Sequence, residues 1–382
     1  MIRVPRHVAI GIGCVVGAAR VAIGAEWSIA PTFSLTFDDD SNRRLTTEPQ
    51  ASQSALLYTS WLFQHSTDNT QLSLSPWLSW QFFRGDLYTS DDNANLSGVF
   101  DWSTERGRLD TSAAVSNEST LFTELTETGI LSSDTHRRLA QGTVSWTFQQ
   151  QEQRSLVLQL SYADTSYTGS QADLLPGYRF PGASIAERFN LTEETTLTGS
   201  VFENELLSRI PGQDTHETGL QVELNRALSE RVQLDASVGA TESSVHGIRN
   251  TETLAGLTLS RSFTAGSLSL GYSRGLTPYG NGMLVQRQQV TLSGTHNFTA
   301  TVSGDASLQY VNNTEPAGIP QSGFTTFYVA GLGVNWRTAE TWTVRAQLGG
   351  QRVQGLGSTA GAHDWRASLG LTWAPYPITR SY

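Results

Sequence analysis

The chain has 382 residues, of which 38% are hydrophobic and only 16% charged, and it carries 35 Gly, 10 Trp, 11 Tyr and 15 Phe. Soluble globular domains carry about 25% charged residues, so this composition does not favour an ordinary soluble protein. All 25 basic residues are arginine, against 35 acidic residues. This acidic balance excludes a nucleic-acid partner, because phosphate contacts need clustered positive charge.

The first 25 residues predict a secretory signal peptide. Two arginines precede an apolar stretch over residues 8–19, and Ile23-Gly24-Ala25 provides the small residues of a cleavage site. Lipoprotein processing at Cys14, the only cysteine, is an alternative that the preceding residues do not favour. We therefore expect residues 1–25 to form a signal peptide and residues 26–382 to form one outer-membrane domain.

The mature chain alternates apolar and polar residues with a period of two. In the first such segment Trp27, Ile29, Phe33, Leu35 and Phe37 alternate with small polar residues. This pattern predicts strands with two chemically different faces, and about 9 to 11 tilted residues are enough to cross a bilayer. No segment after the leader approaches 18 apolar residues, which excludes a helical membrane protein. The alternation recurs over residues 72–82, 143–149, 156–162, 232–238 and 365–373.

Short polar turns alternate with longer polar loops. Five turns of similar sequence begin at Leu191, Leu228, Phe263, Phe298 and Thr338, 35 to 40 residues apart. Three earlier turns are expected at residues 66–69, 104–107 and 150–153. Eight turns and nine loops connect 18 strands, with 16 strands as the alternative count. The loops are expected over residues 38–53, 84–95, 118–137, 164–181, 204–215, 242–249, 274–281, 311–322 and 353–363.

Alternating short and long connections are typical of outer-membrane barrels, whose periplasmic turns are tight and whose outward loops are free to grow. The sheet must close, because an open edge in lipid leaves backbone groups unpaired. We therefore predict an all-β fold, a transmembrane antiparallel up-and-down β-barrel of about 18 strands. A solenoid and a soluble sandwich are the alternatives. Two interfacial girdles are predicted from the tryptophans near strand ends, which are Trp27, Trp61, Trp80, Trp102, Trp146, Trp336, Trp342, Trp365 and Trp373.

Two segments carry a family resemblance. The run Phe33-Ser-Leu-Thr-Phe-Asp-Asp-Asp-Ser-Asn42 and the run Leu228-Ser-Glu-Arg-Val-Gln-Leu-Asp-Ala-Ser-Val238 resemble outer-membrane β-barrel porin-like proteins associated with exopolysaccharide gene clusters. The resemblance implies an outer-membrane barrel that aids polysaccharide export, and it carries over no functional residue. The end of the last predicted strand, at Trp373, also resembles the C-terminal signal of bacterial outer-membrane proteins, although residues 374–382 follow it.

No motif for catalysis or metal binding stands out. The closest histidines of the mature chain are 30 residues apart, and the G-x-S-x-G match at residues 271–275 ends a predicted strand without entering a helix, as a nucleophile elbow would. His296 is expected at the lipid interface. The acidic run Asp38-Asp39-Asp40 is either a cation site or a set of solvated loop charges. We therefore predict no cofactor, no metal and no enzymatic activity, with a barrel enzyme as the least favoured alternative.

The inward phase of the predicted strands carries amide, hydroxyl and charged side chains. Such groups hydrogen-bond water or sugar hydroxyls, and charges of both signs set a transverse field; alternatively they bond one another and plug the barrel. Arg345 and Arg366 are expected to form a basic patch. The residues expected to line the lumen are Gln81, Gln141, Gln149, Gln159, Gln221, Glu223, Gln233, Asp235, Gln289, Asp305, Gln309, Arg345, Gln347 and Arg366.

These expectations favour a pore or export channel in the outer membrane of a Gram-negative bacterium, for polysaccharide or other polar solutes. The alternative is a structural or assembly component of a surface polysaccharide secretion system. The expected partners are outer-membrane lipid and lipopolysaccharide, the barrel assembly machinery and polysaccharide export components. At 16 to 18 strands a barrel is wide enough for a water-filled lumen unless loops fold into it.

Overall fold

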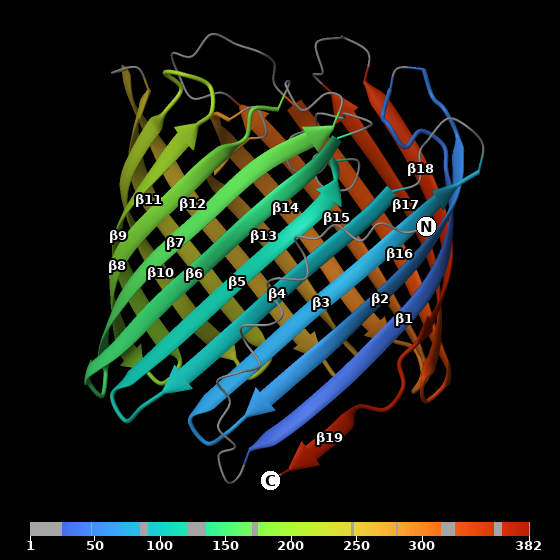
Figure 1. Ribbon diagram of the computed structural model, residues 1–382. Coiled ribbons are helices and arrows are strands. Elements are labelled where there is room, and N and C mark those ends of the chain that lie inside the picture. The colour runs from blue at the N-terminus through green and yellow to red at the C-terminus, as the bar shows by residue number, and fades with distance from the viewer. Residues whose placement is uncertain are drawn as a thin grey trace.

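The computed structural model describes residues 25–46, 48–84, 91–120, 135–169, 175–245, 248–279, 282–314, 325–354 and 361–381. They form one antiparallel sheet that closes on itself, because β18 and β19 both pair with β1 (Figure 1). The strands are β1 (Glu26–Asp40), β2 (Ser52–Ser66), β3 (Thr70–Phe83), β4 (Asp91–Ser103), β5 (Gly107–Ser119), β6 (Thr135–Gln151), β7 (Arg154–Gly169), β8 (Tyr178–Thr192), β9 (Thr195–Ser208), β10 (Thr215–Ser229), β11 (Val232–Val245), β12 (Ile248–Phe263), β13 (Gly266–Pro278), β14 (Leu284–Asn297), β15 (Val302–Thr314), β16 (Thr325–Ala339), β17 (Trp342–Gln354), β18 (Ala362–Trp373) and β19 (Ile378–Ser381).

The last barrel strand is interrupted. β18 pairs Trp373 with Phe33, and after a short irregular segment β19 pairs Ile378 with Ile29, further along the same edge of β1. β18 and β19 together therefore form the eighteenth strand of the barrel. The predicted fold class and strand number are confirmed, and the residues after Trp373 extend the closing seam.

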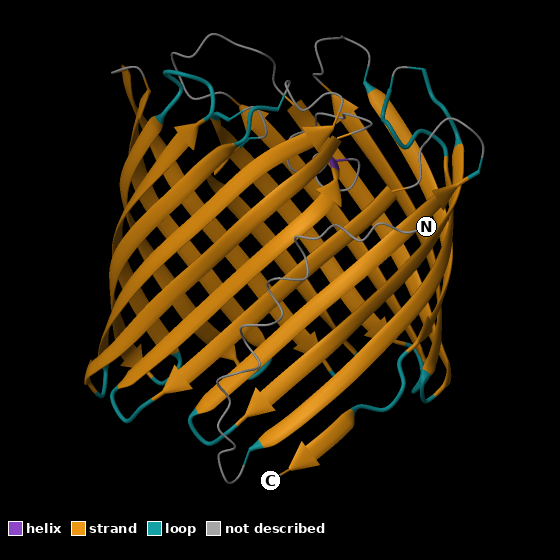
Figure 2. Cartoon of the chain, in the orientation of Figure 1, coloured by secondary structure: helices purple, strands orange, loops and turns teal. Residues whose placement is uncertain are grey.

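All eight predicted turns lie at one end of the barrel, and the strand ends that the longer connections join lie at the other (Figure 2). The strands run further toward the loop end than the sequence predicted: β10 and β11 continue pairing as far as Thr215 and Val245, inside the expected loops. Beyond the lipid both faces of a strand meet water, so the alternation of polarity fades while the backbone pairing continues. The predicted signal peptide lies outside the described residues, apart from Ala25, and stays a prediction.

Side chains on both faces of the sheet are exposed. On β7 the side chains of Leu158 and Leu160 are 45% and 63% exposed, and Gln159 between them is exposed as well. Successive residues of a strand point to opposite faces, so neither face of this strand is packed against a second layer. This arrangement excludes the sandwich alternative and leaves a hollow barrel with an apolar exterior.

Nine of the ten tryptophans follow the outward register. Trp102 and Trp146 lie near the turn end with their ring centroids 5.9 Å apart, and Trp342 and Trp373 stack at 6.1 Å. His296 is also on the outward register, where its ring contacts Phe298 near a turn. Aromatic rings of this kind favour the zone between lipid tails and water. In the part of the chain that the structure describes, no helix is long and apolar enough to cross a membrane.

Candidate functional site: the lumen and the loop inside it

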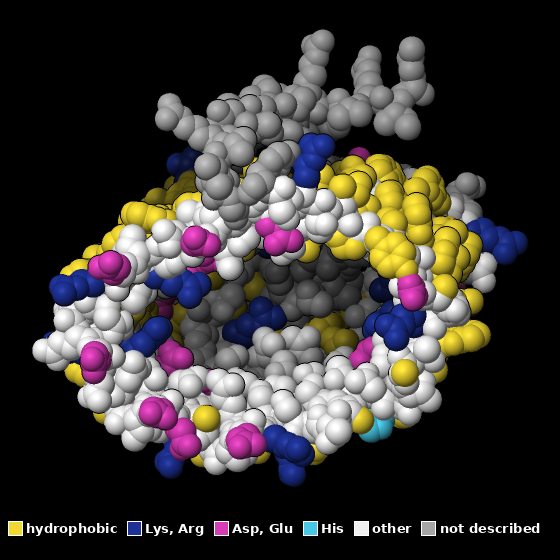
Figure 3. All heavy atoms as spheres, turned by 90° about the horizontal axis from the view of Figure 1, so that it is seen from below, with side chains coloured by type: hydrophobic (Ala, Val, Ile, Leu, Met, Phe, Trp, Pro, Cys, Tyr) yellow, Lys and Arg dark blue, Asp and Glu magenta, His cyan; other side chains and the backbone are white. Residues whose placement is uncertain are grey.

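The strand register places all fourteen predicted lumen residues on the same face of the sheet, which is the inner face. Directly paired residues, such as Gln347 with Ser368 and Gln221 with Ser200, lie on the same face, so the inward positions can be followed from strand to strand around the barrel. The view along the barrel from the turn end shows charged side chains around a central opening and hydrophobic side chains on the outside (Figure 3). The part that these residues play in solute passage stays a prediction.

One inward group joins three neighbouring strands. Arg345 on β17 donates from Nη2 to Asp305 Oδ2 on β15 at 2.9 Å, and from Nη1 to Asn335 Oδ1 on β16 at 2.9 Å. Asn335 Nδ2 completes the set by donating to Asp305 Oδ1 at 3.1 Å. The sequence predicted the two charged residues as separate lumen positions. It did not predict Asn335, which lies between them.

Arg366 on β18 meets Asp38 on β1 across the closing seam. Its Nε and Nη2 atoms lie 3.1 Å and 2.9 Å from Asp38 Oδ1. Arg345 lies opposite Gly370, four residues along β18 from Arg366, and has its own carboxylate partner. The expectation of a joint basic patch was therefore wrong, because each arginine is neutralised where it stands.

Three other predicted lumen residues are engaged within the wall. Gln149 donates to backbone oxygens of its own turn, and Asp235 accepts from Asn225 on the neighbouring strand. Gln81 is fully buried, donating to Ser54 Oγ at 2.7 Å and accepting from Arg43 at 2.8 Å. Gln81 therefore faces inward but is covered, and the residue that covers it belongs to a loop.

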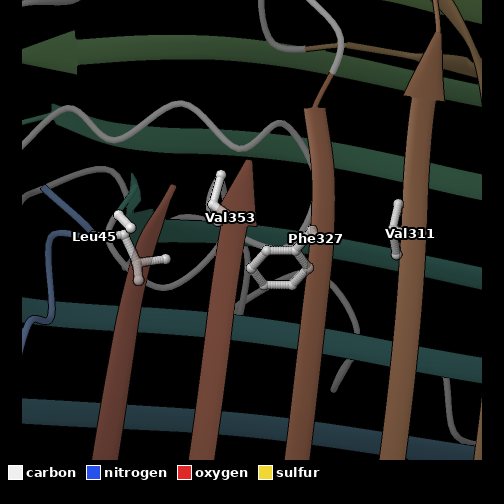
Figure 4. Close-up of a cluster of buried hydrophobic side chains, with 5 residues drawn as sticks. Leu45, Val311, Phe327 and Val353 are labelled. Atoms are coloured by element: carbon white, nitrogen blue, oxygen red, sulfur yellow. The ribbon is translucent and has the colours of Figure 1, made fainter. Parts of the chain in front are cut away.

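That loop connects β1 and β2, and its described residues 41–46 fold into the barrel; we call residues 41–51 the inward loop. Leu45 is 2% exposed and packs in a cluster with Val311, Phe327 and Val353 (Figure 4). These three side chains come from β15, β16 and β17, strands that lie beyond β18 from the start of the loop. A loop residue reaches them together only from the inner face of the wall.

Asn42 fixes the start of the inward loop. Its backbone N–H donates to Asp40 Oδ1 at 3.0 Å and to Asp364 Oδ1 at 2.8 Å, and its Nδ2 donates to the His363 carbonyl at 3.0 Å. The Leu45 N–H closes a turn on the Asn42 carbonyl at 2.8 Å, with Leu45 in the left-handed region at φ 46°. The turn directs Leu45 to one side of the loop.

Arg43 extends the inward loop to the other side, toward β3. Its Nη2 donates to Gln81, and its guanidinium lies 5.0 Å from the centroid of the Phe83 ring. Burial lowers the pKa of Arg43, and the charge of Arg366 adds to this effect. The inward loop thus lines the wall from β15 to β3 and narrows the loop-end mouth. The sequence predicted only a polar loop here, and Leu45, its one large aliphatic residue, was the one signal of a buried contact.

The motifs weighed for chemistry do not form a reactive site. Residues 271–275, the G-x-S-x-G match, run within β13, which leads through residues 279–283 to β14. Of the acidic run, Asp38 pairs with Arg366, while Asp40 accepts from the Asn42 backbone. Within the described residues, no three His, Cys, Asp or Glu side chains are grouped so as to hold a metal ion.

No protein-family model matches the chain, and no curated protein matches it by sequence. Solved structures do match. The crystal structure of Pseudomonas aeruginosa OccK2 (OpdF) has a TM-score of 0.51 and 12% identity, covering 92% of this chain and 98% of that one. A BenF-like porin from Pseudomonas fluorescens Pf-5 has a TM-score of 0.51 and 10% identity, covering 93% and 99%.

The fold is that of an outer-membrane porin. The predicted porin fold agrees with this likeness. The predicted outer-membrane location and the expectation that the chain is not an enzyme stay predictions. Identities near 10% establish the fold alone. The association with exopolysaccharide gene clusters, which the sequence resemblance implied, stays a prediction.

Proposed function

We propose that the protein is an outer-membrane channel through which small polar solutes pass. The observation that carries this proposal is the exposure of adjacent residues on opposite faces of one strand. Leu348 on the outer face of β17 is 62% exposed, and Gln347 on the inner face is exposed too. An apolar side chain on one side and an amide on the other fit lipid outside and water inside.

The inner wall suits polar cargo. The ion pairs Asp305–Arg345 and Asp38–Arg366 place positive and negative charges on the wall, and together they add no net charge to it. Exposed ion pairs are worth only about 0–1 kcal/mol, so Asp305 and Arg345, both partly open to the lumen, can exchange partners with a passing solute. We propose outer-membrane lipid and lipopolysaccharide as the surroundings of the apolar exterior.

The sequence also led us to expect export of polysaccharide, which would be a second class of cargo for the same lumen. The inward loop narrows the loop-end mouth, because Leu45 and Arg43 are both held against the inner wall. This narrowing is why we propose small solutes as the cargo. A role in assembling a secretion system would need partner proteins and no open path.

Conductance in planar lipid bilayers tests the proposal. We expect the refolded barrel to produce discrete, voltage-independent current steps. Neutral polymers of increasing size should separate the two classes of cargo, since a narrow channel excludes all but the smallest, whereas a glycan exporter admits larger ones. A correctly folded barrel that inserts into the bilayer but carries no current would contradict the proposal and favour the assembly role.

A further inference from the structure

One tryptophan departs from the pattern of the other nine. Trp77 lies on the inward register of β3, where it is opposite Ser60 on β2 and Asn95 on β4. Trp80, three residues further along the same strand, lies on the outward register with Leu57 as its partner. The lipid interface accounts for Trp80 and its eight counterparts, but it gives no reason for a large ring facing the lumen.

Trp77 is paired with a second inward ring. Tyr58 on β2 lies opposite Ser79, and the centroids of the Tyr58 and Trp77 rings are 5.8 Å apart at an interplanar angle of 34°. Both side chains are half-buried, so each keeps part of its surface open. Two tilted rings side by side make a short apolar platform, and the residues paired with them on the neighbouring strands carry hydroxyl and amide groups.

The platform lies further into the barrel than the inward loop. Gln81, two inward positions further along β3 from Trp77, is held by Arg43 of the inward loop. A solute that passes the loop on this side of the barrel therefore meets the two rings next. The placement suits a binding step on the path, rather than a patch remote from it.

Uncharged polar groups lie beside the rings. The residues paired with Trp77 are Ser60 and Asn95, and the residue paired with Tyr58 on β3 is Ser79. Ser79 accepts a hydrogen bond from Asn93, but the Asn95 side chain bonds to none of the residues that the structure describes. An amide with both a donor and an acceptor is thus available beside an aromatic face.

We propose that Tyr58 and Trp77 form a stacking site for neutral pyranose sugars, with Asn95 as a hydrogen-bonding partner. A pyranose ring presents an apolar face of C–H groups and an edge of hydroxyls. The face packs on an aromatic ring, whose electron-rich surface attracts the C–H groups, and the edge hydroxyls bond to an amide. The lack of charge at the paired positions favours a neutral sugar over an ionised solute.

This inference rests on the proposed channel function, and blockade of ion current by maltose tests it. We expect maltose to interrupt the current of the wild-type channel and to block the Trp77→Ala variant about tenfold less well, the loss typical of one stacking contact. Tyr58→Ala should weaken the block to a smaller extent. Trp80→Ala is the matched control: it removes the same side chain from the opposite face of β3 and should leave the block unchanged.

The outcomes separate the two proposals. A wild-type channel that conducts but is not blocked by maltose would overturn the sugar site and leave the channel function standing, as would equal block of the Trp77→Ala and wild-type channels. If the barrel does not conduct, calorimetric titration of maltose into the detergent-solubilised protein decides the matter. Binding that is lost in Trp77→Ala would uphold the site without the channel, and absence of binding would overturn it. Heat-dependent gel migration of each variant establishes that its barrel is folded.

Discussion

Deleting residues 43–45 from the inward loop is expected to raise the single-channel conductance severalfold. These residues place Arg43 against β3 and Leu45 against β15 to β17, so the loop covers the inner wall at the loop-end mouth. Without them the loop loses both contacts that hold it inside. The path at the loop-end mouth then widens, and the ion current rises with its cross-section.

Point variants distinguish the loss of the contact from the loss of chain length. Leu45→Asp puts a charge into an apolar cluster, which is costly to bury, and should release the loop and raise the conductance as the deletion does. Gln50→Asp, which adds the same charge to an exposed position of the same loop, should leave the conductance unchanged. A folded deletion variant with the wild-type conductance would show that the inward loop does not limit the current.

The second large effect concerns the lipid-facing wall. Leu348→Arg is expected to lower the free energy of unfolding by about 2–4 kcal/mol, the cost of arginine near the bilayer midplane of a barrel. Leu348 lies in the middle of β17, between Leu332 and Ala367 on the neighbouring strands, with its side chain on the outer face. No partner of opposite charge is at those paired positions.

The matched control for this effect is the adjacent residue. Gln347→Arg places the same side chain one position away but in the lumen, where water solvates it, and should change the stability by no more than about 0.5 kcal/mol. Urea titration of both variants in lipid vesicles measures the two costs. Equal destabilisation by the two substitutions would contradict the assignment of the two faces.

The sequence predicts the wall of this barrel well because each strand carries its own pattern. In residues 232–238, for instance, apolar and polar residues alternate without a break, and Leu228 begins a tight turn just before them. Strand phase and turn positions are local properties of the chain. They require no knowledge of which strands meet at the seam.

The pairing inside the lumen depends on closure and could not be predicted locally. Asp38 and Arg366 are 328 residues apart, and only the pairing of β1 with β18 brings them together. Leu45 meets Phe327 for the same reason, because the seam places the first loop beside β16. The prediction of a basic patch was wrong because the acidic partners of the two arginines lie far from them in the chain and could not be seen in the local sequence.

Trp77 marks a different limit. Its inward phase was visible from the serines around it, at Ser73, Ser75 and Ser79. Its neighbour Tyr58 comes from another strand, and the strand register, which sets the two rings beside each other, follows from turn geometry that the sequence gives only approximately. The phase of Trp77 is therefore a local property of its strand, whereas the platform of two rings depends on the pairing of two strands.

Cysteine labelling on β7 tests the central claim most directly, namely that one face of each strand meets lipid and the other meets water. In a Cys14→Ser background, Gln159→Cys and Leu160→Cys each provide a single thiol on adjacent, exposed positions. With the protein inserted in lipid vesicles, a charged, water-soluble maleimide should label Gln159→Cys rapidly and leave Leu160→Cys unmodified until detergent is added. Rapid labelling of Leu160→Cys in intact vesicles, with Gln159→Cys protected, would contradict the account.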